Sequence, residues 1–436
     1  MIGKFTKDTI FTFINQIFIT VISLGVMIVI VRVLGPEGKG IFSLALLLPA
    51  FLVILTHFGI GGASIYYLGR NKYDPKEIFG NNILYTVFVS IFAIFIGLAV
   101  IFFFSPQLFP GVEKKYLFLA LFLIPLQHFL NFINIILLGI QKIKKYNFVL
   151  FFQNFIFLIL ITILLLGLHF GIVMVITAQI ASFILAGILL FFLVKREAKG
   201  ISFKLNRLYL KDVFSYGSKA YFSNIFDFLN SYSVPFLINI FINPVAVGFY
   251  SVAMALVGKL LFFSQSAATV LYPRVSSEKN PKRLKDFTPI ICRGVLSITT
   301  IGAILSFFLS YWLIVLLFSK TFLNAVQVFR ILLIGVVPMS GSGILSNDIA
   351  GRGKPILNTY IYGRTFFLST ILYVILIPRW GIEGAAWAMT ISYFFLFITM
   401  LITYAKISGN KIRDTIILQK SDFQFYKHYL KGLHIL

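Results

Sequence analysis

Charged residues are scarce in this sequence. Only 12% of its 436 residues are Asp, Glu, Lys or Arg, about half the usual share of ~25%, while 59% are hydrophobic and the mean hydropathy is +0.95. A soluble chain of this length would need far more polar surface to cover its core. The apolar residues instead form runs of about 20, the length of a helix that crosses the hydrocarbon of a bilayer. The composition therefore predicts an all-α polytopic membrane protein.

Cysteine and the common motifs of catalysis are also lacking. Cys292 is the single cysteine, so an intramolecular disulfide framework is excluded. The sequence has no P-loop pattern GxxxxGK[ST], no HExxH and no Cys/His cluster, so we expect no Walker-type ATPase, no metal site and no cofactor. The longest expected outside loop has only about a dozen residues, which argues against a membrane enzyme with a large outside domain. We expect a protein that is not an enzyme.

Glycines, prolines and charges divide the apolar runs into twelve expected transmembrane helices. Their expected ranges are 9–33, 40–68, 82–104, 116–139, 148–167, 171–194, 213–241, 246–273, 289–311, 325–349, 356–378 and 381–404. The tightest expected hairpin is GLHFGI at 167–172.

Acidic residues are rarer than basic ones, 14 against 38, and the net charge is +24. With both termini placed in the cytoplasm, 27 Lys and Arg lie in the expected cytoplasmic segments and six in the outside loops. Short loops follow this positive-inside rule. The basic excess therefore indicates topology and attraction to anionic membrane lipids, and we expect no nucleic-acid partner.

Part of the sequence occurs twice. LGPEGKGIFSLA at 34–45 returns as INPVAVGFYSVA at 242–253, at an offset of 208. Three further landmarks recur in the same order at offsets of 204, 212 and 210, although Gly/Pro hairpins resemble one another in any membrane protein. The repeat predicts two parallel six-helix lobes, 1–194 and 212–404, joined by a basic cytoplasmic linker, 195–211. A basic, aromatic tail, 405–436, is expected to lie in the cytoplasm or at the membrane interface.

The stretches RVLGPEGKGIFSLALLL, GASIYYLGR, NPVAVGFYSVAMAL with LYPRVS, and RWGIEGAAWA resemble bacterial polysaccharide (O-antigen-type) flippases. These belong to the multidrug/oligosaccharidyl-lipid/polysaccharide exporter superfamily, whose lipid II flippases have two more helices than we find here. The resemblance covers nearly the whole chain and implies a two-lobed, MATE-like twelve-helix transporter in the bacterial cytoplasmic membrane.

The resemblance also implies a substrate and partners. Such a protein would move undecaprenyl-pyrophosphate-linked oligosaccharide to the outer leaflet by alternating access, driven by H⁺ or Na⁺ if transport is ion-coupled. Polysaccharide polymerase or assembly proteins would be its partners. The alternative is a cation-coupled exporter of drugs or other small molecules with the same fold, which a cavity richer in Lys and Arg than in acids disfavours.

Ionisable residues inside expected helices are costly and suggest function. Asp227 and Lys259 are both expected near mid-depth in adjacent antiparallel helices. In one interpretation they form a neutralised pair that only holds the helices together. In the other, Lys259 attracts the pyrophosphate or acidic sugars and Asp227 couples transport to a proton or Na⁺.

Other charged candidates lie closer to the expected cytoplasmic side. Lys219 and Arg364 are candidates to bind the pyrophosphate. The guanidinium fork of Arg364 suits two phosphate groups, although Arg364 is also placed to snorkel to the headgroups. Arg293 is a further candidate for the cationic cavity, with snorkelling as its simpler interpretation. Asp348 is expected to contribute to ion coupling, to cap the next turn or to pair with Arg352.

Uncharged polar residues in the expected helices are candidates to contact sugars, because sugar hydroxyls both donate and accept hydrogen bonds. Asn, Gln and His rows equally serve as interhelical contacts, each hydrogen bond stabilising by about 0.6 kcal/mol. Gln127, Asn131 and Asn134 have the spacing i, i+4, i+7 of a single helix face. The full set of candidates is Asn15, Gln16, His57, Gln127, Asn131, Asn134 and Asn224.

Overall fold

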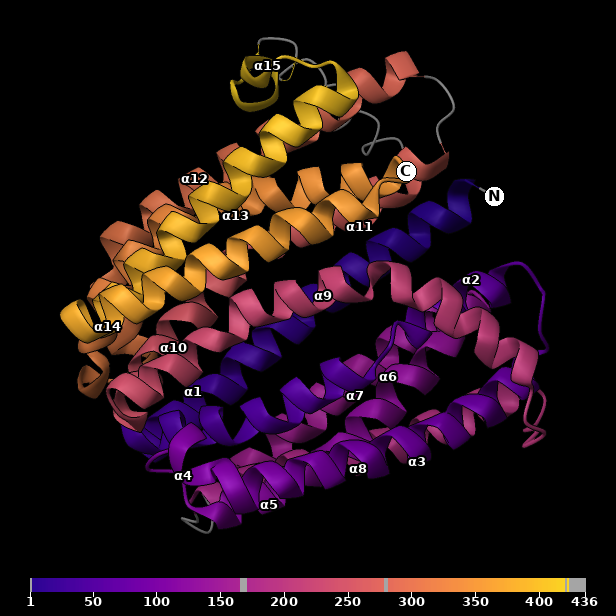
Figure 1. Ribbon diagram of the computed structural model, residues 1–436, viewed down its shortest axis with the longest axis horizontal. Helices are drawn as coiled ribbons and strands as arrows, with labels where there is room; N and C mark the ends of the chain where they lie inside the picture. Colours follow the sequence, from indigo (N-terminus) through magenta and orange to yellow (C-terminus); the bar gives the residue numbers. More distant parts are fainter. Residues whose placement is uncertain (1, 165–170, 278–280, 420–421, 423–436) are drawn as a thin grey trace. The chain divides into compact units, whose positions relative to one another are not determined.

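The computed structural model describes residues 2–164, 171–277, 281–419 and 422 of the chain, and every regular element in these residues is a helix (Figure 1). The expected hairpin at 167–172 falls largely outside the described residues. In chain order the elements are α1 (Ile2–Thr56), α2 (Ile60–Gly69), α3 (Pro75–Ala99), η1 (Val100–Phe104), α4 (Ser105–Leu108), α5 (Lys114–Leu121), α6 (Leu123–Gly139), α7 (Ile143–Thr162), α8 (Ile172–Glu197), α9 (Arg207–Phe241), α10 (Pro244–Leu260), α11 (Phe262–Ser277), α12 (Pro281–Phe318), η3 (Lys320–Phe322), α13 (Asn324–Gly351), α14 (Pro355–Ser408) and α15 (Ile412–Ile416).

Several helices have the length and apolarity to cross a bilayer. In the part of the chain that the structure describes, eight qualify individually, and the bent pair α10 and α11 makes a ninth. This confirms a helical polytopic membrane protein. The expected twelve helices and the cytoplasmic termini stay predictions.

The two longest segments each contain a turn. Within α1, Gly35 has φ 66° and ψ −173°, and within α14, Gly381 has φ 59° and ψ −138°. Neither conformation is helical, and glycine adopts both without the steric cost of a Cβ. In Figure 1 the ribbons of α1 and of α14 each double back. Gly35 lies between two helices that the sequence predicts as separate, and Gly381 is the first residue of the expected helix 381–404.

The expected helix 40–68 is wrong as a single helix, because α1 ends at Thr56 and α2 begins at Ile60. Phe58 and Gly59 have φ of 42° and 70°, which interrupts the hydrogen-bond ladder. The break packs closely on Gly217 of α9, where an added Cβ would overlap the carbonyl oxygen of Phe58. Non-helical backbone at membrane depth is tolerated where protein or a cavity surrounds it. His57 therefore lies at a helix break.

Two compact units make up the chain. The first comprises Met1–Ser251 and Leu317–Phe322, and the second Val252–Leu316 and Leu323–Leu436. The first unit contains α1 to α9, and the second contains α11, α13, α14, α15 and most of α12. The lobes 1–194 and 212–404, with their linker and tail, stay a prediction.

Candidate functional site

A polar cavity of about 540 Å³ lies within the first unit. Residues from the second half of α1, from α6 and from α7 form most of its wall. Phe183 of α8 and Phe228 of α9 complete it. No charged side chain is among the lining residues that the structure describes, and the polar lining residues are His57, Gln127, Asn131, Asn134, Tyr146 and Gln153. Such a wall suits a neutral ligand with many hydrogen-bonding groups better than an ion.

Helical spacing accounts for how these residues meet. Gln127, Asn131 and Asn134 lie on the same face of α6, as their sequence spacing predicts. Tyr146 and Gln153 of α7 were missed by the sequence interpretation. They are seven residues apart, as Gln127 and Asn134 are, and this shared spacing was the available signal. The polar residues of α6 and of α7 therefore line the same cavity.

The cavity wall retains unused hydrogen-bonding capacity. Asn134 is only 4% exposed, its Nδ2 donates to the Tyr146 carbonyl at 3.4 Å, and its Oδ1 has no partner among the described residues. Gln153 Nε2 donates to Ser182 Oγ at 3.4 Å, and Gln153 Oε1 accepts from Asn154 Nδ2 at 3.2 Å. A buried acceptor without a donor is costly, so a ligand hydroxyl at Asn134 would remove that cost.

Two histidines near the cavity have different surroundings. His128 is fully buried, and its ring nitrogens lie 3.0 Å from Thr56 Oγ1 and 3.0 Å from Ser90 Oγ. Thr56 gives its own hydroxyl hydrogen to the Leu52 carbonyl at 2.6 Å, so His128 Nε2 donates to Thr56 and Nδ1 accepts from Ser90. His128 is thus a packing residue with both nitrogens satisfied. His57, in contrast, lines the cavity.

Polar contacts at the start of α9 hold this helix on the first unit. The Asn206 side chain caps the helix by accepting from the Tyr209 amide at 3.0 Å. The buried Tyr209 hydroxyl donates to Asn82 Oδ1 at 2.8 Å and lies 2.9 Å from Ser64 Oγ. One turn later, Asp212 Oδ2 accepts from Lys72 at 2.5 Å and from Tyr73 at 2.6 Å. These contacts fix the helix that carries Phe228.

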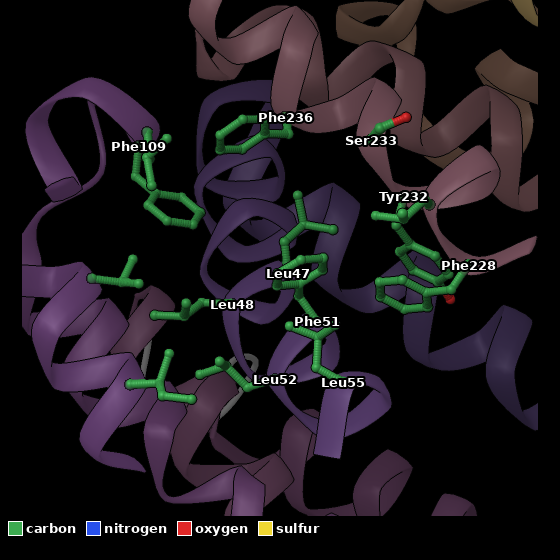
Figure 2. A pocket seen from close by; sticks show the side chains of 14 residues that line it. Leu47, Leu48, Phe51, Leu52, Leu55, Phe109, Phe228, Tyr232, Ser233 and Phe236 are labelled. Atoms are coloured by element: carbon green, nitrogen blue, oxygen red, sulfur yellow. The ribbon is translucent and has the colours of Figure 1, made fainter. Parts of the chain in front are cut away.

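A second cavity, apolar and about 310 Å³ in volume, lies on the other side of α1 (Figure 2). Leu47, Leu48, Phe51, Leu52 and Leu55 of α1 line it, whereas Ala50, Val53, Ile54 and the following His57 line the polar cavity. The second half of α1 is therefore a wall with a cavity on each face. Phe228 belongs to the lining of both.

Most of the expected cationic residues lie elsewhere. The side chain of Lys219 is outside the described residues. Asp227 is in the first unit and Lys259 in the second, so their pairing stays a prediction. Arg364, in α14, is exposed. Asp227, Lys259 and Arg364 are not among the residues that line either cavity described above.

The other two charged candidates have partners within the second unit. Asp348 is fully buried, forms an ion pair with Arg352, and accepts from Thr288 Oγ1 at 2.6 Å. Its pairing with Arg352 is one of the three expected arrangements. Arg293 binds both carboxylate oxygens of Asp422, at 2.7 and 2.5 Å, and donates to the Asp414 carbonyl. Arg293 is 3% exposed, so this guanidinium anchors the tail and does not snorkel to the headgroups.

The remaining polar candidates do not line the polar cavity. Asn15 is buried, and its Nδ2 donates to the Asn147 carbonyl at 3.1 Å, an interhelical contact. Gln16 and Asn224 are exposed. The structure therefore brings together four of the seven residues that the sequence indicated as sugar contacts.

Comparison with known proteins identifies a family that this chain matches. The family model described as polysaccharide biosynthesis protein matches residues 5–278. The capsular polysaccharide biosynthesis protein CapF of Staphylococcus aureus is 26% identical, over 92% of this chain and 99% of its own length. The probable low-salt glycan biosynthesis flippase Agl15 of Haloferax volcanii is 27% identical over 42% of this chain.

The length of the matches varies between relatives. The chain spans 39% of the length of Agl15, and the same share of the uncharacterized membrane protein MJ1068 of Methanocaldococcus jannaschii, which is 27% identical over 44% of this chain. Among solved structures, the lipid II flippase MurJ in an inward closed conformation aligns with a TM-score of 0.72 and 16% identity, over 93% of this chain and 89% of MurJ. That likeness shows a shared fold. The chain belongs to the polysaccharide biosynthesis protein family.

Proposed function

We propose that this protein is a flippase that moves undecaprenyl-pyrophosphate-linked oligosaccharide from the inner to the outer leaflet of the bacterial cytoplasmic membrane. Transport proceeds by alternating access and involves no chemical step on the substrate. The observation that carries the proposal is the uncharged polar cavity at His57, Gln127, Asn131 and Asn134, in a chain of the polysaccharide biosynthesis protein family.

The cavity fits the glycan part of such a substrate. Its amide and imidazole groups both donate and accept hydrogen bonds, as sugar hydroxyls do. Its volume of about 540 Å³ falls within the range of about 300–1,000 Å³ of small-molecule sites, which is enough for a few sugar rings. Tyr146, Phe183 and Phe228 supply aromatic surface for the apolar faces of these rings.

The proposed topology has twelve crossings in two six-helix lobes. The turns at Gly35 and Gly381 would each divide one long helix into two crossings. Helix α9, which is less apolar, would be a further crossing, as would α10 with α11. The lobes would be 1–194 and 212–404, joined by the basic linker 195–211 and followed by the tail 405–436, with both termini cytoplasmic.

The charged residues receive roles outside the polar cavity. Lys219, Lys259 and Arg364 would bind the pyrophosphate during transport, and Asp227 would couple transport to H⁺ or Na⁺. Anionic lipids would neutralise the basic cytoplasmic loops, and a polysaccharide polymerase or assembly protein would receive the product.

Translocation of a fluorescent polyprenyl-pyrophosphate oligosaccharide in proteoliposomes tests the proposal. We expect wild-type protein to deliver the glycan to the opposite leaflet, and the double variant Gln127→Ala/Asn131→Ala to slow this roughly tenfold or more, because each lost hydrogen bond to a ligand removes about 1 kcal/mol. Gln16→Ala is the matched control, since Gln16 is an exposed amide away from the cavity.

Two outcomes would contradict the proposal. If folded wild-type protein moves no lipid-linked glycan but exports a cationic dye under an ion gradient, the protein is a drug exporter of the same fold. If translocation proceeds and the double variant moves substrate as fast as Gln16→Ala, the glycan does not bind in this cavity.

A further inference from the structure

The apolar cavity has the chemistry of a hydrocarbon site. Its wall includes Leu52 at 1% exposure and Leu48 at 4%. Among the lining side chains that the structure describes, only Tyr232 and Ser233 contribute polar atoms, their hydroxyl oxygens. Aromatic rings meet in pairs around it: Phe109 and Phe236 have centroids 5.8 Å apart, and Phe228 stacks on Tyr232 at 4.3 Å. Figure 2 shows these side chains on different sides of the cavity.

The apolar cavity adjoins the polar cavity. The two cavities lie on opposite faces of the same helical stretch, residues 47–57, and both reach Phe228. Phe51 and Phe228 face each other there, with centroids 6.3 Å apart. One amphiphilic molecule with a polar head and a single apolar chain would fill both cavities by passing the ring of Phe228.

We infer that the apolar cavity binds the isoprenoid chain of the lipid-linked glycan near its attachment point, while the polar cavity binds the sugars. This inference rests on the proposed function and adds a site for the chain. The volume of about 310 Å³ holds a few isoprene units, so the rest of a long chain lies in the bilayer. The occupant is the chain of the substrate and not a phospholipid, because only the substrate places sugars in the adjoining polar cavity.

The local backbone supports a shaped cavity in this position. Ile96 and Val100 contribute to its wall, and the chain there passes from α3 into the π-helical turn η1. A π-helical turn accommodates an extra residue and shifts the side chains that follow it relative to a straight α-helix. Val100, a wall residue, is the first residue of this turn.

Photo-crosslinking tests the inference. The probe is a polyprenyl-pyrophosphate disaccharide with a diazirine on an isoprene unit close to the pyrophosphate, in proteoliposomes of the full chain. We expect labelled peptides within residues 47–55 and 228–236, and loss of labelling when unlabelled lipid-linked glycan is added. A phosphatidylglycerol with the same diazirine on an acyl chain is the parallel probe, and we expect it to label this site far less.

Two neighbouring substitutions supply a matched pair. Ile96→Trp fills the apolar cavity, whereas Phe95→Trp changes a side chain that is 67% exposed and does not line it. We expect Ile96→Trp to reduce labelling and translocation roughly tenfold, since several buried CH₂ contacts of the chain are lost, and Phe95→Trp to leave both close to wild type. If Ile96→Trp does not fold, chain length in the wild-type protein is the second measurement. Apparent affinity should then fall when isoprene units next to the pyrophosphate are removed and change little when distal units are removed.

The results separate this inference from the proposed function. Translocation of the lipid-linked glycan with labelling outside the cavity, or labelling by phosphatidylglycerol that the glycan does not displace, overturns the inference and leaves the flippase. Affinity that is the same for a water-soluble diphosphate glycan also overturns the inference. If no lipid-linked glycan binds or moves, the proposed function fails first.

Discussion

Gly40 packs directly against the carbonyl of Pro244, and a Cβ built at Gly40 would overlap that oxygen. The relationship is reciprocal, because a Cβ at Gly248 would overlap the carbonyl of Pro36. These four residues are the corresponding Pro and Gly of the two copies of the repeated motif, 208 positions apart. Each copy thus supplies the glycine that lets the backbone of the other copy approach.

The first prediction concerns this contact. Gly40→Ala and Gly248→Ala should each destabilise the protein by about 1–3 kcal/mol or more, the usual effect of overpacking, since a backbone carbonyl cannot rotate away as a side chain can. Thermal unfolding in detergent measures this. Gly62→Ala is the control, because nothing lies within 4 Å of its added Cβ. Equal melting temperatures for Gly40→Ala and Gly62→Ala would show that the two motifs separate without cost.

The second prediction separates the two histidines. His128→Leu should lower stability by about 1–3 kcal/mol, because Thr56 and Ser90 lose a buried partner. His57→Leu should leave the melting temperature nearly unchanged and slow translocation of the lipid-linked glycan, because His57 faces the polar cavity. Measuring stability and transport for both variants checks this. A reversed pattern would make His128 the functional histidine.

The third prediction concerns the buried ion pair of the tail. Asp422→Asn should destabilise the second unit by about 3 kcal/mol, because removal of one partner leaves the buried charge of the other uncompensated. The side chains of Arg293 and Asp422 are 4% and 1% exposed, respectively. Hydrogen exchange of residues 412–419 should accelerate in the variant. Arg413→Gln removes an exposed charge nearby and is the control, and equal exchange in the two variants would mean that the pair does not hold the tail.

The fourth prediction concerns pH. Hydrogen bonds from Lys72 and then from Tyr73 lower the pKa of the Asp212 carboxyl below its ordinary value. A carboxyl whose pKa is lowered by folding stabilises the folded state above its unfolded pKa, and loses this contribution as the pH falls through the folded pKa. The melting temperature of wild type should therefore exceed that of Asp212→Asn at neutral pH, and the difference should vanish only in acid, below the usual range of aspartate.

Glu37→Gln, which removes an exposed carboxylate, controls for the general effect of acid on this comparison. A difference between wild type and Asp212→Asn that stays constant down to the lowest pH would show that the contact with Lys72 contributes nothing through its charge.

The sequence predicted features that depend on local periodicity. The stripe Gln127, Asn131 and Asn134 follows from helical spacing alone. The turn at Gly381 falls where glycine, proline and charge interrupt the apolar run in the sequence. The break at His57 was missed because apolar residues continue through it, and the residue packed against it, Gly217, belongs to a helix far away in the sequence.

The other differences between the sequence-based predictions and the structure arise from contacts between residues that are far apart in the sequence. Asp422 meets Arg293 across 129 positions, and no local pattern indicates that partner. Likewise, α9 is held in the first unit by hydrogen bonds from Lys72 to Asp212 and from Tyr209 to Asn82.

The stretch of α1 between two cavities has a mechanical consequence. A helix flanked by empty space on both faces can tilt without expelling packed side chains, and each displacement that narrows one cavity widens the other. A ligand with sugars against Val53 and Ile54 and its chain against Leu48 and Leu52 would hold the helix between its two ends. Departure of either end would then leave the helix free to move toward the emptied cavity.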